Sequence, residues 1–180
     1  MKYVALLRGI NVSGQKKIKM ADLKAMFMKM GFNQVITYIQ SGNVVFESDE
    51  KEIHTIEEKI QKGIEDTFRF DVPVLVKTKN EIEEILQNSP YTKQEDLEAK
   101  RVYYVFLKHT PEQEMIANLV QKDYPYELFS ISENCVYLNC MNGAGKAKLT
   151  NTIIERKLKV SATTRNHRTM LKLIELSKGN

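Results

Sequence analysis

The chain has 180 residues, of which 42% are hydrophobic and 28% are charged, and its formal net charge at pH 7 is +4. This length allows one compact domain or two small ones, and the composition is typical of a globular protein. The sequence has no run of about 18 apolar residues, which a membrane-spanning helix requires, and its amino terminus lacks the pattern of a secretory signal. We therefore expect a cytoplasmic protein that has no membrane partner.

The charged residues are distributed unevenly along the chain. The segment from Glu47 to Asp66 contains eight acids and three lysines, whereas the segment from Asn134 to Ile174 contains eight lysines or arginines and one acid. The first 21 residues contain five basic residues and no acid. This separation indicates an electric field that favours anionic partners, unless the charges disperse over the surface once the chain folds.

The first half of the chain predicts the element order β-α-β-β-α-β. We expect strands over residues 3–7, 35–40, 44–47 and 72–77, and helices over residues 20–30 and 53–68. The second helix has the clearest apolar stripe, at Ile53, Ile56, Ile60, Ile64 and Phe68. Ser41-Gly42-Asn43 predicts a hairpin turn. Thr78 and Glu81 have capping-box spacing, which predicts a short helix over residues 80–87.

The second half of the chain predicts the same order again. We expect strands over residues 101–108, 127–131, 135–139 and 160–162. Thr110 at the N-cap and Pro111 at the first helical position predict the start of a helix, and further helices are expected over residues 147–158 and 166–177.

The duplicated order predicts an α+β fold with two ferredoxin-like halves, each an antiparallel sheet with helices packed on one face. We expect the halves to span residues 1–88 and 101–180, the second with an extra carboxy-terminal helix. The polar residues 89–100 would connect them. One continuous mixed sheet is the alternative.

The loop between the first strand and the first helix is the first candidate site. Gly9 and Gly14 allow the backbone to approach an anion closely, and the loop carries several polar and basic side chains: Arg8, Asn11, Lys17 and Lys19. The predicted hairpin tip is the second candidate, because Gln40, Ser41 and Asn43 offer amide and hydroxyl groups for hydrogen bonds. The alternatives are a flexible loop with solvated lysines and a turn with no role beyond its own conformation.

Two further segments are basic and lie at predicted helix starts. The glycine-rich segment 142–150 is not a P-loop, because Cys140 occupies the first glycine position and Ala147 replaces the magnesium-binding hydroxyl. Lys146 at a helix N-terminus still predicts an anion site. In the segment 163–168, Thr164 is the expected N-cap, and a helical stripe of basic residues is expected to bind an anion or pair with the acidic helix: Arg165, Arg168 and Lys172.

Catalytic and metal-binding motifs are missing, so we expect no metal and no cofactor. His167 is the one histidine in a suggestive context. Cys135 and Cys140 lie five positions apart on one predicted strand, so we expect reduced thiols on opposite faces. The strand aromatics are expected either in the core or stacked on nucleobases: Tyr103, Tyr104, Phe106 and Tyr137.

Three blocks of the sequence, LLRGINVSGQKKIKMADLKAMF, TYIQSGNVVF and ATTRNHRTMLKL, resemble the bacterial domain-of-unknown-function family 1697. The resemblance implies a cytoplasmic protein with a duplicated α+β architecture, and it implies no activity. Family members typically have tryptophan where this chain has His167, which argues against a catalytic role for that residue. The blocks carry polar residues in predicted loops and helix starts, which implies a shared ligand site: Arg8, Gly9, Asn11, Gln40, Ser41, Gly42, Asn43, Arg165, Asn166 and Arg168.

These patterns favour a binding module for an anionic ligand, either nucleic acid or a phosphorylated small molecule. One alternative is an enzyme for a nucleotide or phosphorylated metabolite that uses Arg8, Lys17 and Arg165 to stabilise transition-state charge. Another is a protein–protein interaction module. Convergence of the segments 8–19, 40–43 and 165–168 on one pocket would favour a ligand site.

Overall fold

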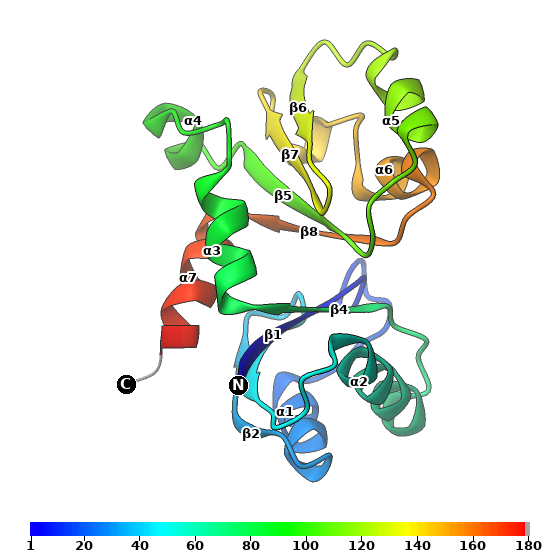
Figure 1. Ribbon diagram of the computed structural model, residues 1–180, viewed down its shortest axis with the longest axis vertical. Coiled ribbons are helices and arrows are strands. Elements are labelled where there is room, and N and C mark those ends of the chain that lie inside the picture. The colour runs from blue at the N-terminus through cyan, green and yellow to red at the C-terminus, as the bar shows by residue number, and fades with distance from the viewer. Residues whose placement is uncertain (179–180) are drawn as a thin grey trace. The chain divides into compact units, whose positions relative to one another are not determined.

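Two four-stranded antiparallel sheets organise the chain, as the computed structural model shows for residues 1–178 (Figure 1). By compactness, the chain divides into two units. The first comprises Met1–Glu84 together with the residues from Lys172 onward, and the second comprises Ile85–Leu171. The predicted α+β class is confirmed.

The sheet of the first unit has the strand order β2-β3-β1-β4, which is the ferredoxin-like order. Its elements are β1 (Lys2–Leu7), α1 (Met20–Lys29), β2 (Asn33–Tyr38), β3 (Asn43–Glu47), α2 (Ile53–Phe68) and β4 (Val74–Thr78). Alternate strand residues such as Tyr3, Ala5 and Leu7 join one hydrophobic core with the apolar stripes of both helices. Both helices therefore pack on the same face of the sheet, as predicted.

The sheet of the second unit repeats this order as β6-β7-β5-β8. Its elements are β5 (Val102–Leu107), α5 (Gln113–Val120), β6 (Glu127–Ile131), β7 (Cys135–Cys140), α6 (Asn151–Leu158) and β8 (Ala162–Asn166). Leu119 of α5 and Ile154 of α6 pack in one core with alternate residues of the strands. Cys140 belongs to this core, Cys135 does not, and both cysteines are free and buried.

The remaining helices follow the sheets in sequence. α3 (Lys79–Gln87) begins with the predicted capping box: the Glu81 backbone N–H donates to Thr78 Oγ1 (3.2 Å), and the Thr78 N–H donates to Glu81 Oε2 (2.8 Å). The segment expected to be a connection contains α4 (Gln94–Glu98), whose Asp96 accepts a hydrogen bond from Asn139 Nδ2 (2.9 Å). α7 (His167–Lys178) ends the described chain.

Three predicted boundaries in the second half are wrong. α5 begins at Gln113 rather than at Pro111, and no side chain caps it. α6 begins at Asn151, where Thr150 Oγ1 accepts a hydrogen bond from Ile153 N–H, and only a single 3₁₀ turn (Ala144–Lys146) precedes it. The last strand covers Ala162–Asn166 rather than residues 160–162, because these residues pair with β5 over a long sequence distance, and the helix predicted from residue 166 begins at His167.

Candidate functional site

The loop from Gly9 to Lys19 has an unusual backbone. Five of its residues have positive φ angles: Gly9 (72°), Asn11 (54°), Ser13 (49°), Gly14 (76°) and Lys16 (43°). Positive φ strains residues that carry a Cβ, and such strained residues cluster at functional sites. The loop is nevertheless ordered by its own hydrogen bonds, from Gln15 N–H to Val12 O (2.9 Å) and from Asn11 N–H to Lys16 O (3.2 Å).

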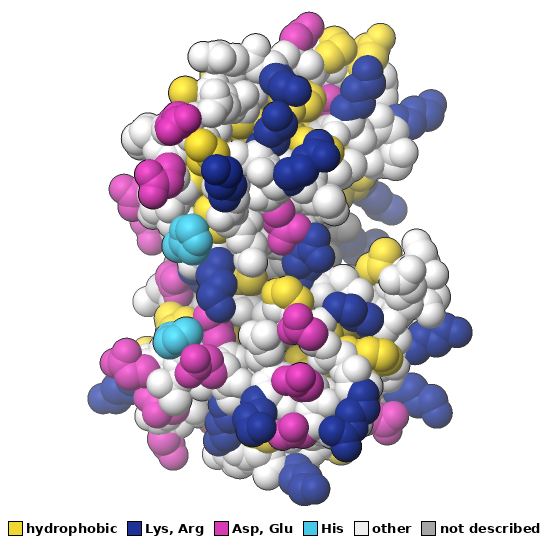
Figure 2. All heavy atoms as spheres, turned by 90° about the vertical axis from the view of Figure 1, so that its right-hand side faces the viewer, with side chains coloured by type: hydrophobic (Ala, Val, Ile, Leu, Met, Phe, Trp, Pro, Cys, Tyr) yellow, Lys and Arg dark blue, Asp and Glu magenta, His cyan; other side chains and the backbone are white. Residues whose placement is uncertain are grey.

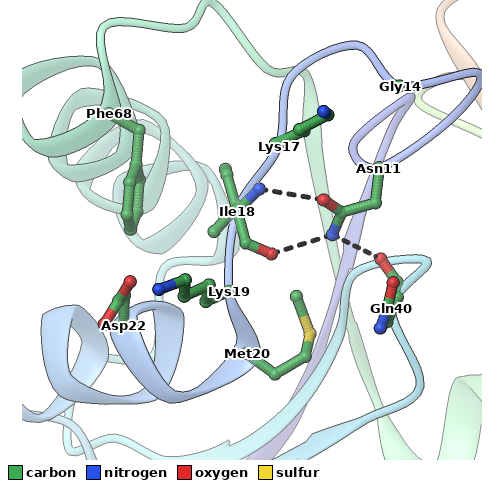
Figure 3. A pocket seen from close by; sticks show the side chains of 9 residues that line it. All are labelled: Asn11, Gly14, Lys17, Ile18, Lys19, Met20, Asp22, Gln40 and Phe68. Atoms are coloured by element: carbon green, nitrogen blue, oxygen red, sulfur yellow. Dashed lines mark hydrogen bonds between the residues drawn. The ribbon is translucent and has the colours of Figure 1, made fainter.

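Asn11 fastens this loop to the hairpin tip. Its Nδ2 donates to the carbonyl oxygens of Ile18 and Gln40, both at 2.9 Å, and its Oδ1 accepts from Ile18 N–H at 2.9 Å (Figure 3). A hydrogen bond of this kind contributes about 1 kcal/mol. Asn11 was predicted as a ligand-binding residue, and its three side-chain hydrogen bonds make it a residue that holds the loop in place.

Gly42 explains why the hairpin tip lies against the loop. A Cβ at this position would lie 2.6 Å from Leu7 Cβ and 2.9 Å from Ile10 Cδ1. The φ of Gly42 is +78°, and its carbonyl accepts from Leu7 N–H at 2.8 Å. Only glycine permits both this conformation and this close approach. The two predicted segments 8–19 and 40–43 are therefore adjacent.

Together these segments and two helices enclose a pocket of about 660 Å³. It is lined by Asn11, Gly14, Lys17, Ile18, Lys19, Met20, Asp22, Gln40 and Phe68. Figure 3 shows Phe68 reaching it from the end of α2, while Lys19 points toward Asp22. Within residues 1–178, the N–H groups of Gly14 and Lys17 donate to no acceptor. The pocket thus combines an apolar wall with lysines, and two of its lining residues have backbone N–H groups without a protein acceptor.

The other predicted residues of the first unit support the turn. Asn43 is fully buried, and its Nδ2 donates to Tyr38 O and to Ser41 Oγ, both at 3.0 Å. Arg8 is half-buried directly after β1, and its backbone N–H donates to Pro73 O at 3.0 Å. Gln40 is exposed and lines the pocket.

Arg165 and its neighbours belong to the second unit, and the helical stripe predicted for them is wrong. Arg165 lies on β8 and is buried, and its Nη1 donates to Thr163 Oγ1 and Thr164 O, both at 2.8 Å. Burial lowers its pKa to about 10, so it remains a cation at neutral pH. Asn166 Oδ1 caps α7 through Thr169 N–H (2.8 Å), in place of the predicted Thr164.

Arg168 and Lys146 are both exposed. Arg168 lies in the first turn of α7, so one arginine rather than two opposes the macrodipole there. Lys146 ends the 3₁₀ turn and is separated from the start of α6, so it does not lie at a helix N-terminus as predicted.

The sequence pattern missed Phe68, Met20 and Asp22 as pocket residues. Phe68 was assigned to the apolar stripe of its helix, and both Phe68 and Met20 pack against the core of the first unit. Their positions could have identified them as pocket residues. Met20 begins α1 and Phe68 ends α2, and an apolar side chain at the end of a helix is only partly covered.

The predicted base-stacking role of the strand aromatics is not supported by their burial. Tyr104 and Phe106 have no exposed surface, and Tyr137 is 4% exposed. The Tyr104 hydroxyl lies 2.9 Å from His167 Nδ1, and burial lowers the pKa of His167.

Among the described residues, no three His, Cys, Asp or Glu side chains are grouped to hold a metal ion. No helix within residues 1–178 is long and apolar enough to cross a membrane.

Comparisons with known proteins bear on the fold. Residues 1–137 match the model of a family described as a protein of unknown function, DUF1697. Among solved structures, the chain is similar to the conserved bacterial protein SP0830 from Streptococcus pneumoniae, with a TM-score of 0.74 and 23% identity over 97% of each chain. A comparison with curated proteins gives no match. At this identity, the similar structure shows a shared fold.

Proposed function

The chain belongs to the DUF1697 family of proteins of unknown function, as its sequence blocks predicted, and we propose that it is a binding protein for a small anionic ligand. The ligand occupies the pocket of the first unit. It carries a phosphate group attached to an apolar or aromatic part, as a nucleotide or a phosphorylated metabolite does.

The observation that carries this proposal is that one pocket contains both an apolar wall and groups that can bind an anion. Lys17 and the free N–H groups of Gly14 and Lys17 suit a phosphate, because backbone donors and a lysine together form an anion-binding concavity. Phe68 and Ile18 suit the apolar part of the ligand. Asp22 is the one acid in the lining, and Lys19 points toward it.

The size of the pocket favours a small molecule over nucleic acid at this site. Its volume of about 660 Å³ falls within the roughly 300–1,000 Å³ typical of small-molecule sites. The strained loop is consistent with a preorganised site, because the Asn11 hydrogen bond to Gln40 and the close approach at Gly42 hold the loop against the hairpin tip. Arg8, Ser41 and Asn43 are proposed to support this arrangement.

We also propose that this binding function belongs to the bacterial cytoplasm. In support, Cys135 and Cys140 are free and buried, as is usual in reducing compartments, and the similar solved structure is that of a bacterial protein. Fractionation of the source cells checks this location.

A thermal-shift screen of nucleotides and phosphorylated sugars tests the ligand class. A ligand at about 100 times its Kd adds about 2.7 kcal/mol and raises Tm by several degrees. The double variant Lys17→Ala/Lys19→Ala is expected to abolish that rise. Lys24→Ala/Lys29→Ala is the matched control, because both lysines are exposed on α1 and outside the pocket. The proposal is wrong if no compound shifts Tm, or if both variants lose the shift equally.

A further inference from the structure

A second basic surface lies on the second unit, in the groove between α5 and α6. The groove has a volume of about 540 Å³ and is lined by Met115, Asn118, Gln121, Lys122, Arg156, Lys157 and Lys159. Four of these seven residues are cations and none is an acid. Figure 2 shows lysine and arginine side chains gathered over the face of the second unit that carries these helices.

The fold directs these cations to the groove. Leu119 of α5 and Ile154 and Leu158 of α6 are buried in the core of the second unit, so the opposite faces of both helices are exposed. Lys122 follows the end of α5, and Arg156 and Lys157 lie in the last turn of α6. The groove is thus lined by basic side chains that lie at or just beyond the carboxyl ends of two helices.

The lysines from the two helices are crowded. The cation of Lys122, and to a lesser extent that of Arg156, lowers the pKa of Lys157. None of the groove's four cations forms an ion pair within residues 1–178, whereas Lys62 pairs with Asp66 (3.4 Å) and Lys79 with Glu83 (3.4 Å) elsewhere.

The helix macrodipoles do not account for this crowding. A cation in the last turn is favourable for its own helix. The macrodipole of α6 therefore explains the positions of Arg156 and Lys157. It does not explain why Lys122, which follows α5, lies near Lys157, because like charges repel. An anion between the two helices would remove this repulsion.

We propose that this groove binds the phosphate backbone of nucleic acid without regard to base sequence. A backbone presents phosphates at regular intervals, and several cations along a groove neutralise them with release of counterions. Asn118 and Gln121 add amide donors for phosphate oxygens. The groove has no aromatic side chain on which a base would stack, which favours contacts with the backbone rather than the bases.

The shape of the surface favours a chain-like polyanion over a membrane. Surface-bound helices insert apolar side chains into the lipid interface. Here Met115 is the one large apolar residue of the lining, and it is half-buried within a concave groove. This site shares no residue with the pocket of the first unit, so it is independent of the function proposed there.

Fluorescence anisotropy with a labelled single-stranded oligonucleotide of about 20 nucleotides, and with the matching duplex, tests the inference on the full chain. We expect binding at about 50 mM salt that weakens steeply by about 200 mM. Lys122→Glu/Lys157→Glu is expected to lower the affinity at least about tenfold. Lys24→Glu/Lys29→Glu changes the net charge by the same amount on exposed positions of α1, and it is expected to stay within about twofold of the native chain.

The salt dependence supplies a second readout. Removing two phosphate contacts in Lys122→Ala/Lys157→Ala is expected to reduce the slope of log affinity against log salt by about 1.4 for a single strand. Circular dichroism and Tm confirm that each variant is folded. The inference is overturned if the native chain does not bind at about 50 mM salt, or if the α1 control weakens binding equally. It is also overturned if Lys17→Ala/Lys19→Ala weakens oligonucleotide binding and the groove variants do not. A third contrary result is tighter binding to phosphatidylserine vesicles than to the oligonucleotide, weakened to the same extent by the groove variants.

Discussion

The two units have the same strand order but differ in where their polar and basic side chains gather. In the first unit, a long loop after β1, residues 8–19, folds against the hairpin tip and forms a pocket. In the second unit, the corresponding connection after β5 spans only residues 108–112, and the basic groove lies on the helices instead. One scaffold therefore carries two different surfaces, and the sites follow the loops and helix faces rather than the fold.

The helices that cover the two sheets also differ in charge. α2 is long and carries acids that include Glu58, Glu65 and Asp66, with lysines among them. α5 and α6 are short and carry one acid each, Glu114 and Glu155, but the charged residues that line the groove between them are all cations. The buried faces are alike, so the cores impose no such difference. The two units therefore differ in the charges on their exposed helix faces, where side chains are available to a binding partner.

Glycine substitutions at two similar turns are expected to give the largest difference between the units. Gly42 and Gly143 both have φ near +80°, but a Cβ at Gly143 has no atom within 4 Å, whereas a Cβ at Gly42 would overlap Leu7. Positive φ costs a residue with a Cβ about 1–2 kcal/mol, and overpacking adds about 1–3 kcal/mol. Urea denaturation should show a loss of about 3 kcal/mol for Gly42→Ala and about 1 kcal/mol for Gly143→Ala.

Equal losses at the two glycines would contradict the packing of the hairpin tip on the loop. The pocket provides a further check, because Gly42→Ala displaces the tip that carries Gln40, whereas Gly143→Ala leaves the first unit unchanged. A ligand found for the pocket should bind the Gly42 variant more weakly and the Gly143 variant as well as the native chain.

Capping residues are expected to give a smaller difference. Both Thr78 and Thr110 have capping-box spacing in the sequence, but only Thr78 makes the hydrogen bonds. Burial alone would raise the pKa of Glu81, and hydrogen bonds from Thr78 together with the Lys77 ammonium outweigh this and lower it. Thr78→Ala should therefore cost about 1 kcal/mol in denaturant unfolding, and Thr110→Ala less than about 0.5 kcal/mol. A cost at Thr110 as large as that at Thr78 would contradict the observed start of α5.

The contrast between these threonines shows what sequence can predict about this fold. Apolar periodicity located seven of the eight strands and most helices of the described chain, because the stripes on α2 and the alternation on β1 reflect local geometry. At Thr110 the same local rules failed, because the backbone is still extended at Glu112 (φ −63°, ψ 141°) and the helix begins only at Gln113. β8 was misplaced because its pairing with β5 joins residues far apart in sequence.

The candidate site was predictable in composition but not in shape. The basic, acid-poor loop and the polar hairpin tip were visible as separate segments. The contact between these two segments depends on the close approach of Gly42 to Leu7, which cannot be predicted from a local sequence pattern. Phe68 was assigned to the core from its stripe, and its second role at the pocket follows from its place at the end of α2.

The smallest expected effect is a pH dependence that distinguishes the second unit from the first. Burial lowers the pKa of His167 below its ordinary value of 6.5, so the folded chain binds fewer protons than the unfolded chain as the pH falls through that value. Stability contributed by the neutral ring is therefore present above pH 6.5 and is lost below it. In the first unit, the lowered pKa of Glu81 has the same sign, but it acts only below its ordinary value of 4.5.

Urea unfolding between about pH 8 and pH 5.5 separates these two groups, because carboxylates such as Glu81 stay ionised over that range. We expect the native chain to lose stability over this interval and His167→Gln to lose less, since glutamine cannot take up a proton. His54→Gln is the matched control, because His54 is exposed on α2 and its ring lies 3.3 Å from Glu58 at the surface. Identical pH curves for the native chain and His167→Gln would show that the pKa of His167 is the same in the folded and unfolded chain. A curve flattened by His54→Gln instead would assign the neutral-pH dependence to the first unit and reverse the comparison.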